Sequence, residues 1–517
     1  MTTDFVSTMI PNGWQQCVLP DFAHIVMGQS PPSTTYNRSG DGLPFFQGKA
    51  EFGDLYPTVN IYCSQPNKIA KQGATLLSVR APVGPTNLAQ QDCCIGRGLA
   101  AIHSCGGIAP KFLLYLFRSI EPEISGKGTG STFKAITKGF VEDLHFGLPP
   151  LNEQRRIVAK IEELFSELDK GTESLKAARA KLNIYRQAVL KHAFEGKLTA
   201  QWREENKDKL ETPEQLLARI KQEREARYEQ QLQEWKAAVK EWEESGKSGK
   251  RPARSRMPKP VSTMAEEEIS HLESLPSGWL WLTAESVGIV QLGRQRSPKN
   301  RSKDYPTKYI RAANITEQGL DLDDVLDMDF LPHELSAYRL EKGDLVLSEA
   351  SGSAAQVGKP AIWDDQIPNC CFQNTVIRHQ PYCRDYAVYL LWLYRFLYVS
   401  GKFAQVAGGV GINHLSAFKF AQIALPLCSL AEQQEIVRLL EERFAAIEQQ
   451  EREIDSALNQ AEMLRQSILK KAFTGQLVPQ DPRDEPASVL LERIKAEREK
   501  AAQNNHSKKT RKKKTTA

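Results

Sequence analysis

The stretch EQRRIVAKIEELFSELDKGTESLKAARAKLNIYRQAVLKHAFEGKLT, residues 153–199, recurs as EQQEIVRLLEERFAAIEQQEREIDSALNQAEMLRQSILKKAFTGQLV, residues 432–478. The two copies align without a gap at an offset of 279, and 16 of the 47 positions are identical. A helical element that occurs twice in one chain indicates two half-molecules joined covalently. Such a chain can imitate a two-fold dimer while each half carries its own surface.

The duplication extends into the sequence before each helix. The repeated segments are Pro11–Trp14 with Pro276–Trp279, Gly73–Ser78 with Gly343–Ser348, and Cys93–Cys94 with Cys370–Cys371. Their offsets grow from 265 to 277, as small loop insertions in the second copy would cause. Insertions in surface loops cost little stability, so a shared fold with divergent loops is expected. The order of the chain is therefore module, helix, module, helix.

Each long helix carries a hydrophobic repeat of 3.5 residues, which is typical of a coiled-coil seam. The predicted seam positions are Ile157, Ile161, Leu164, Leu168, Leu175 and Leu182 in the first copy and Ile436, Leu440, Ile447, Ile454, Leu464 and Ile468 in the second. We expect the two helices to pair with each other in an antiparallel arrangement, because matched seams in one chain are at high local concentration. The alternative is that each helix packs separately on its own module. Gly196 and Gly475 are expected to end the helices in a left-handed turn.

Bulk composition sets limits on the class of protein. The chain has 517 residues and a net charge of +5, much of it in the tail that contains Lys508, Lys509 and Arg511–Lys514. Overall charge therefore does not establish a nucleic-acid partner. The nine cysteines have no zinc-like spacing, and a reducing environment is expected. No signal peptide or membrane-spanning run is visible, so we expect a cytoplasmic protein without membrane partners.

The two globular modules have a mixed α/β pattern, with short β-branched runs between Gly and Pro. The second module contains a dense basic run, which suits contacts to DNA phosphates. Its predicted DNA contacts are Arg294, Arg296, Lys299, Arg301, Lys303 and Arg311. An alternative is that this run is only a solvated face. The first module has the sparser basic residues Arg38, Lys49, Arg80, Arg97, Lys127 and Lys134, of which Lys49, Arg80, Lys127 and Lys134 are predicted DNA contacts. Taken alone, the first module would not suggest DNA binding.

The motifs of the common enzyme classes are missing. The sequence contains no HExxH, no nucleophile elbow, no Walker A motif and no Asn-Pro-Pro-Tyr loop for amino-group methylation. We therefore expect no catalytic residues, no metal site and no cofactor bound by this chain.

In its order of motifs the chain resembles the specificity subunits of type I restriction–modification systems over nearly its whole length. That family has two target-recognition domains, each opening near Pro-x-Gly-Trp, alternating with helical regions that start Pro-x-x-Glu-Gln and end Phe-x-Gly-x-Leu. These motifs stand here at Pro150–Gln154, Phe194–Leu198 and Phe473–Leu477, while Pro426 lies farther from Glu432 than the pattern requires. The segments Gly28–Gly48, Tyr309–Ile315 and Val357–Lys359 are also similar to recognition domains. Gln47, Asn314 and Lys359 from these segments, and Ser348 from the repeated segment Gly343–Ser348, complete the predicted DNA contacts.

The resemblance implies an α+β fold with two target-recognition domains separated by two long antiparallel coiled-coil helices, pseudo-two-fold symmetric. The implied domains are recognition domain 1 (1–150), helical spacer 1 (151–199), a charged extension (200–274), recognition domain 2 (275–429), helical spacer 2 (430–478) and a basic tail (479–517). Each recognition domain would read half of an asymmetric bipartite DNA target, and the spacers would set the half-site separation. Two methyltransferase subunits and two motor–nuclease subunits would be the protein partners, and would bind S-adenosylmethionine, ATP and Mg²⁺.

Two other classes of function remain as alternatives. One is a coiled-coil scaffold that does not read sequence, although a scaffold has no need of two divergent sets of loops. The other is a bifunctional restriction–methylation enzyme, which the missing motifs disfavour. A further repeat, Leu216–Lys221 with Leu490–Lys495, follows the two helices. We interpret these segments as docking arms for the methyltransferase subunits, with solvated helical linkers as the alternative.

Overall fold

The computed structural model describes residues 10–127, 135–247, 251–252, 254, 261, 263–295, 304–351, 356–407 and 413–514. The chain forms two compact units, one of residues 1–177 with 454–517 and the other of residues 178–453. The helices α5 (Leu151–Phe194) and α14 (Leu430–Phe473) each contribute to both units. The internal duplication therefore corresponds to two units, which are described in turn.

Unit 1 is built on a four-stranded antiparallel sheet, β2-β10-β7-β8, and a five-stranded sheet, β3-β5-β4-β9-β6. Its strands are β1 Gln15–Val18, β2 Ala23–Met27, β3 Tyr36–Asn37, β4 Leu43–Phe46, β5 Tyr62–Cys63, β6 Ile69–Ala70, β7 Thr75–Ser78, β8 Thr86–Leu88, β9 Cys93–Ile95, β10 Leu99–Ser104 and β11 His145–Leu148. Its helices besides α5 and α14 are α1 Leu19–Phe22, α2 Pro110–Ser119, α3 Glu121–Gly126, α4 Lys138–Glu142 and α15 Ala487–Lys514.

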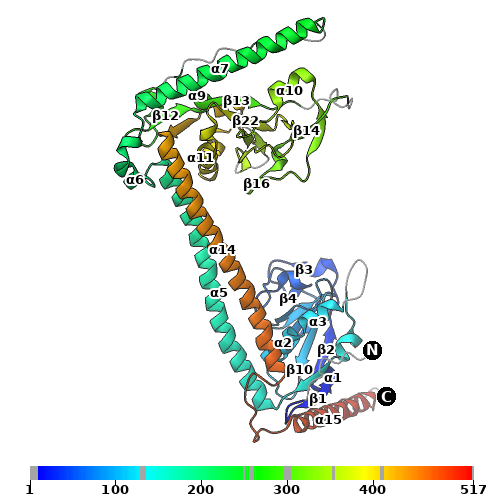
Figure 1. Cartoon of the computed structure of the whole chain (residues 1–517). Coiled ribbons are helices and arrows are strands. Elements are labelled where there is room, and N and C mark those ends of the chain that lie inside the picture. Colours follow the sequence, from blue (N-terminus) through cyan, green and yellow to red (C-terminus); the bar gives the residue numbers. More distant parts are fainter. Residues whose placement is uncertain are drawn as a thin grey trace. The chain divides into compact units, whose positions relative to one another are not determined.

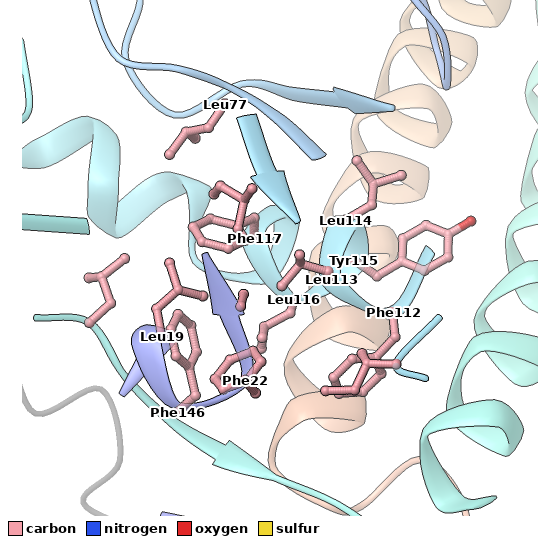
Figure 2. Packing of buried hydrophobic residues seen from close by; sticks show 14 of the residues in the cluster. Leu19, Phe22, Leu77, Phe112, Leu113, Leu114, Tyr115, Leu116, Phe117 and Phe146 are labelled. Carbon is pink, nitrogen blue, oxygen red and sulfur yellow. The ribbon is translucent and has the colours of Figure 1, made fainter. Parts of the chain in front are cut away.

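The core of unit 1 lies around α2, whose positions from Phe112 to Phe117 are all buried. Figure 2 shows these side chains packed with Phe22 of α1, Leu77 of β7 and Phe146 of β11. A helix that is apolar on nearly every side must be covered on nearly every side. The sheet covers one side of α2, and Phe473 of α14 meets Phe112 edge-on. The long helices are therefore part of the module's core.

Unit 2 repeats this plan with the sheet β13-β22-β18-β20 and the sheet β17-β14-β21 (Figure 1). Its strands are β12 Leu280–Thr283, β13 Gly288–Leu292, β14 Pro306–Ile310, β15 Ile315–Thr316, β16 Gly319–Leu320, β17 Leu326–Asp329, β18 Leu345–Ser348, β19 Ala350–Ser351, β20 Pro360–Ile362, β21 Cys371–Phe372, β22 Val376–Pro381, β23 Asn413–His414 and β24 Ala424–Leu427. Its helices are α6 Ala200–Glu205, α7 Pro213–Glu244, α8 Glu266–Ile269, α9 Ala284–Val287, α10 Pro332–Tyr338, α11 Ala387–Val399, α12 Lys402–Val406 and α13 Ala417–Ala421.

The repeated Trp and Glu residues join each module to its following helix. Because β1 pairs with β11, which leads into α5, Trp14 lies beside the start of that helix. Its indole Nε1 donates a hydrogen bond of 3.0 Å to the buried carboxylate of Glu153, and burial raises the pKa of that carboxyl. In unit 2 the Nε1 of Trp279 donates to Glu432, also at 3.0 Å. These motifs are repeated because each fixes a module on its helix.

The two long helices pair in an antiparallel arrangement, as predicted. In unit 1 Arg465 of α14 pairs with Asp169 of α5. In unit 2 Arg186 of α5 donates to Glu451 of α14 at 3.0 Å. The residue number falls along α14 as it rises along α5, which only antiparallel pairing allows. The turns after both helices also have the expected form, since the φ angles of Gly196 and Gly475 are 69° and 74°.

The predicted seam is confirmed at most of its positions. The buried members are Ile157, Ile161, Ile436, Leu440, Ile447, Ile454 and Ile468, and the half-buried members are Leu164, Leu168, Leu175 and Leu182. The prediction is wrong at Leu464, whose exposed fraction is 49%. At this level Arg465 faces the partner helix instead, with its guanidinium 4.9 Å from the ring centroid of Phe165. A straight helix drifts from a strict 3.5-residue repeat, which shifts the contact by one residue.

Crosslinking provides a direct test of this pairing. Cysteines replacing Asp169 and Arg465 should react with a short bismaleimide in the native chain, because those side chains form an ion pair. Cysteines replacing Asp169 and Glu448 occupy equivalent repeat positions, and they would react only in a parallel pairing. Mass spectrometry of peptides distinguishes the two products. Crosslinking of the second pair without the first would contradict the antiparallel seam.

The two segments after the long helices begin by packing on the modules. Leu216 and Ile220 of α7 are buried in the core of unit 2, and Leu490 and Ile494 of α15 are buried in the core of unit 1. The solvated-linker alternative is therefore wrong for these turns. Their role as docking arms remains a prediction, and it concerns the later, more exposed turns.

Candidate nucleic-acid interface

Two neighbouring parallel strands place their following loops at one edge of unit 1. Strand β4 pairs in parallel with β9, so Gln47–Lys49 and Gly96–Gly98 emerge side by side. The amide of Gly96 donates to the carbonyl of Phe46 at 2.8 Å. A Cβ atom on Gly98 would lie 2.2 Å from the carbonyl oxygen of Gln47, so only glycine allows this approach.

Two further segments complete this edge. The chain after β2 is held there because the Gly28 amide donates to the Leu99 carbonyl at 2.9 Å, and the Arg97 amide to Ser30 Oγ at 3.3 Å. The turn after β7 is held by Ser78, whose hydroxyl lies 2.8 Å from the Pro82 carbonyl. Four segments distant in sequence thus meet around one hollow.

The hollow has a volume of about 800 Å³. Its lining residues are Ser30, Pro31, Ser33, Tyr36, Gln47, Gly48, Lys49, Ser78, Arg80, Ala81, Arg97 and Gly98. Three of these side chains are cationic and none is acidic. Serine, glutamine and tyrosine side chains supply donors and acceptors beside the positive charge. This composition suits a polyanion that also presents base edges.

The cations of the hollow are free to bind a ligand. Within the described residues, neither Arg80 nor Arg97 has a side-chain hydrogen bond or ion pair inside the chain, and both side chains are exposed. Lys49 is also exposed. Burial raises the pKa of the Glu121 carboxyl, and the charges of Arg118 and Lys49 oppose this rise. An arginine without an acidic partner keeps its full donor capacity for phosphate or base atoms.

The described residues of unit 2 that were predicted to contact DNA through a positive charge are paired with acids of their own module. Arg294 pairs with Glu334 at 2.7 Å and lies over the ring of Phe330, so its guanidinium is used within the fold. Arg311 pairs with Asp324, and Lys359 lies 3.8 Å from Glu317. An internal ion pair does not test DNA binding, so these contacts stay predictions. In the described part of the chain, three exposed cations line one hollow of the first module, which the sequence alone did not suggest.

Two other predicted contacts have internal roles. Asn314 is buried, and its amide donates to the carbonyls of Asp321 and Asp324 at 2.9 and 3.1 Å. The Ser348 hydroxyl donates to the Gln356 carbonyl at 2.9 Å and accepts the Lys359 amide at 3.0 Å. These bonds occupy both groups within the loops, and their assignment as DNA contacts stays a prediction.

The remaining predictions divide into two sets. Gln47, Lys49 and Arg80 are brought together in the hollow, whereas exposed Lys127 follows α3 and does not line it. Arg296, Lys299, Arg301, Lys303 and Lys134 lie outside the described residues. Arg97 and Ser30 line the hollow but were absent from our predicted contacts. The available signal was the Gly-Arg-Gly turn at 96–98 directly after a buried strand.

Neither the thiols nor the carboxylates form a metal or redox site in the described part of the chain. No group of three or more His, Cys, Asp and Glu side chains is placed there to hold a metal ion. The nine cysteines are free, and burial raises the pKa of the Cys93 and Cys371 thiols to about 12. Among the same residues, no helix is both long and apolar enough to cross a bilayer.

Comparison with known proteins assigns the duplicated architecture to a family. The family model described as "Type I restriction modification DNA specificity domain" matches residues 11–177 and 280–457. The chain belongs to this family. Each match covers one module with part of its following helix, in agreement with the two units of the structure.

Individual specificity subunits align with this chain over regions of different length. The putative type I restriction enzyme MjaX specificity subunit of Methanocaldococcus jannaschii is 42% identical over 179 residues, which span 34% of this chain and 42% of that relative. The type I restriction enzyme EcoDI specificity subunit of Escherichia coli is 24% identical over 514 residues, or 95% of this chain and 96% of that relative. The crystal structure of the HsdS subunit from Thermoanaerobacter tengcongensis, 18% identical, covers 92% of this family member and 100% of its own chain, with a TM-score of 0.48.

Proposed function

We propose that this chain is the DNA specificity subunit of a type I restriction–modification complex, in which each module reads one half of an asymmetric bipartite target. The observation that carries the proposal is the open basic hollow of unit 1, formed where loops meet at one edge of a module that occurs twice. Membership of the specificity family supports it. The chain supplies recognition, and partner subunits supply the chemistry with S-adenosylmethionine, ATP and Mg²⁺.

Recognition would combine phosphate contacts with reading of base edges. Cationic side chains supply most of the affinity, and hydrogen bonds in the major groove distinguish all four base pairs. The two half-sites of the target would be separated by a gap whose length the paired helices determine. Each of these helices is continuous over 44 residues, or roughly 66 Å at the usual rise of an α-helix.

Exposed apolar residues suggest where the methyltransferase subunits dock. Ile184 and Tyr185 on α5 are 68% and 43% exposed, and Met463 and Leu464 on α14 are 64% and 49% exposed. The second pair follows the first at the repeat offset of 279. The same apolar pair at the same repeat position, once in each unit, suits two copies of one partner. We assign it to two methyltransferase subunits, with two motor–nuclease subunits completing the complex.

Each substitution at one of these pairs should remove one methyltransferase copy from the complex. Ile184→Asp or Met463→Asp alone should leave one tightly bound methyltransferase copy, and the double variant should bind neither. We expect each change to weaken its copy by 30-fold or more, roughly the effect of losing an interface hot spot. Mass photometry of the reconstituted complex measures the copy number. Ser174→Asp, an exposed change of the same charge on α5, should leave two copies bound. Retention of two copies by the double variant would contradict this docking surface.

Selection from random DNA tests the proposed function. The purified chain with its methyltransferase partner is incubated with duplexes of random sequence, and the retained fragments are sequenced. We expect two short conserved blocks separated by a constant unspecified gap. Retention without any sequence preference would favour the scaffold alternative instead.

A further inference from the structure

Arg80 and Arg97 carry the two guanidinium groups of the hollow on fixed backbone. Arg80 follows β7, and its backbone forms a β-bridge with Ala135, while its carbonyl lies 3.1 Å from the Ser78 hydroxyl. Arg97 stands in the turn between β9 and β10, with its amide bound to Ser30 Oγ. Each side chain therefore starts from a defined point. A side chain anchored in this way loses less freedom when it binds a ligand.

The duplicated module shows that the fold does not need arginine at these two positions. The Gly96 amide donates to Phe46, and the Gln373 amide donates to Ile310 in the same way, so Arg97 corresponds to Asn374. The bridge between Arg80 and Ala135 recurs between Ala350 and His414, so Arg80 corresponds to Ala350. The second module keeps this backbone with asparagine and alanine. The arginines therefore belong to the surface by which the two modules differ.

We propose that Arg80 and Arg97 are specificity-determining residues of the first module and that they read guanine in its half of the DNA target. This inference rests on the proposed function and adds the base that is read. The planar guanidinium matches the O6 and N7 acceptors of guanine with two parallel hydrogen bonds, which no other base offers in the major groove. Lys49, a point charge at the rim, contacts a phosphate. The second module has neither arginine and reads its half with other side chains.

Phosphate binding by both arginines is the competing explanation, and lysine substitutions separate it from base reading. Lysine keeps the positive charge but lacks the rigid fork. A phosphate contact should survive Arg80→Lys or Arg97→Lys with nearly unchanged salt dependence. A bidentate guanine contact should lose most of its discrimination.

The experiment compares variants of the full chain, bound to its methyltransferase partner, on duplex DNA of random sequence. Wild type should enrich guanine at one or more positions of one block. Arg80→Lys or Arg97→Lys should reduce that guanine preference by about tenfold or more and leave the other block unchanged. Lys49→Ala should keep every base preference and lower the salt slope by about one unit. Lys68→Ala, an exposed change in the same module outside the hollow, should alter neither base preference nor the block structure.

Two outcomes would overturn the inference. The first is a guanine preference that is unchanged in both lysine variants, and the second is an equal loss of preference in both blocks. Both leave the proposed function standing, because the wild-type motif with two blocks is still found. A wild type that enriches no sequence would instead remove the proposed function, and this inference with it.

Discussion

Replacing Glu432 by alanine should lower the free energy of unfolding of unit 2 by about 3–5 kcal/mol. The carboxylate is buried and accepts hydrogen bonds from Thr199 at 2.7 Å, from Arg203 at 2.9 Å and from Trp279 at 3.0 Å. Its removal leaves a nearly buried guanidinium without a counter-charge, together with two unpaired donors. Urea unfolding of the full chain, with hydrogen exchange resolving unit 2, measures the loss.

The first repeat provides the matched control. Glu153 accepts from Trp14, but Arg156 keeps its own partner, Asp484, at 2.7 Å. Glu153→Ala therefore leaves only a neutral donor, the indole N–H of Trp14, without a partner. It should lower the free energy of unfolding of unit 1 by about 1–3 kcal/mol. Equal losses in the two repeats, or a loss below about 1 kcal/mol for Glu432→Ala, would contradict the role assigned to the Glu432 cluster.

Unit 2 should become less stable as the pH falls from about 6.5 to about 4. Burial lowers the pKa of His379 from 6.5 to about 4 in the folded state. The neutral ring is fully bonded, with Nε2 3.1 Å from the Ala284 carbonyl and Nδ1 2.7 Å from the Tyr394 hydroxyl. Between these pH values the unfolded chain binds a proton that the folded chain does not bind. Stability should therefore fall by up to about 1.4 kcal/mol per pH unit and should not depend on this group above pH 7.

His379→Gln isolates this contribution. The variant is less stable at every pH, but its stability should lose the slope between pH 6.5 and 4 that belongs to His379. The measurement must resolve the two units, because burial also lowers the pKa of His103 in unit 1 to about 4. The position equivalent to His379 in that unit is Ile102, so the slope from a fully buried ring belongs to unit 2 alone. An unchanged slope in His379→Gln would contradict this assignment.

Local rules predicted the repeated scaffold well. The 3.5-residue periodicity located both helices and most positions of their seam, since the same apolar face must be covered in each copy. The periodicity wrongly placed Leu464 in the seam, because a real helix drifts from the strict repeat. The sequence rules also did not predict the hydrogen bonds from Trp14 to Glu153 and from Trp279 to Glu432. They join residues more than 100 positions apart, and their geometry depends on the pairing of β1 with β11 and of β12 with β24.

The candidate site was harder to predict from the sequence. Basic residues that are close together in the sequence can be paired with acids in the folded chain, and unpaired ones can come together from distant segments. Arg294 and Arg311 belong to a conspicuous basic run, yet acids from other segments neutralise them. Lys49, Arg80 and Arg97 are far apart in sequence. Lys49 and Arg97 come together because β4 and β9 run in parallel, and the turn after β7 adds Arg80. Which cations remain unpaired is therefore a property of the tertiary fold.

Mapping of methylated adenines in cellular DNA shows whether two modules each read half of the target. DNA from cells that make this chain with its methyltransferase partner is sequenced by a method that detects N6-methyladenine. We expect one asymmetric motif of two specified blocks with a constant gap, in which the Arg97→Lys variant relaxes one block only. Methylation at sites with no common motif, or at a single uninterrupted block, would contradict the claim that two modules each read half of the target.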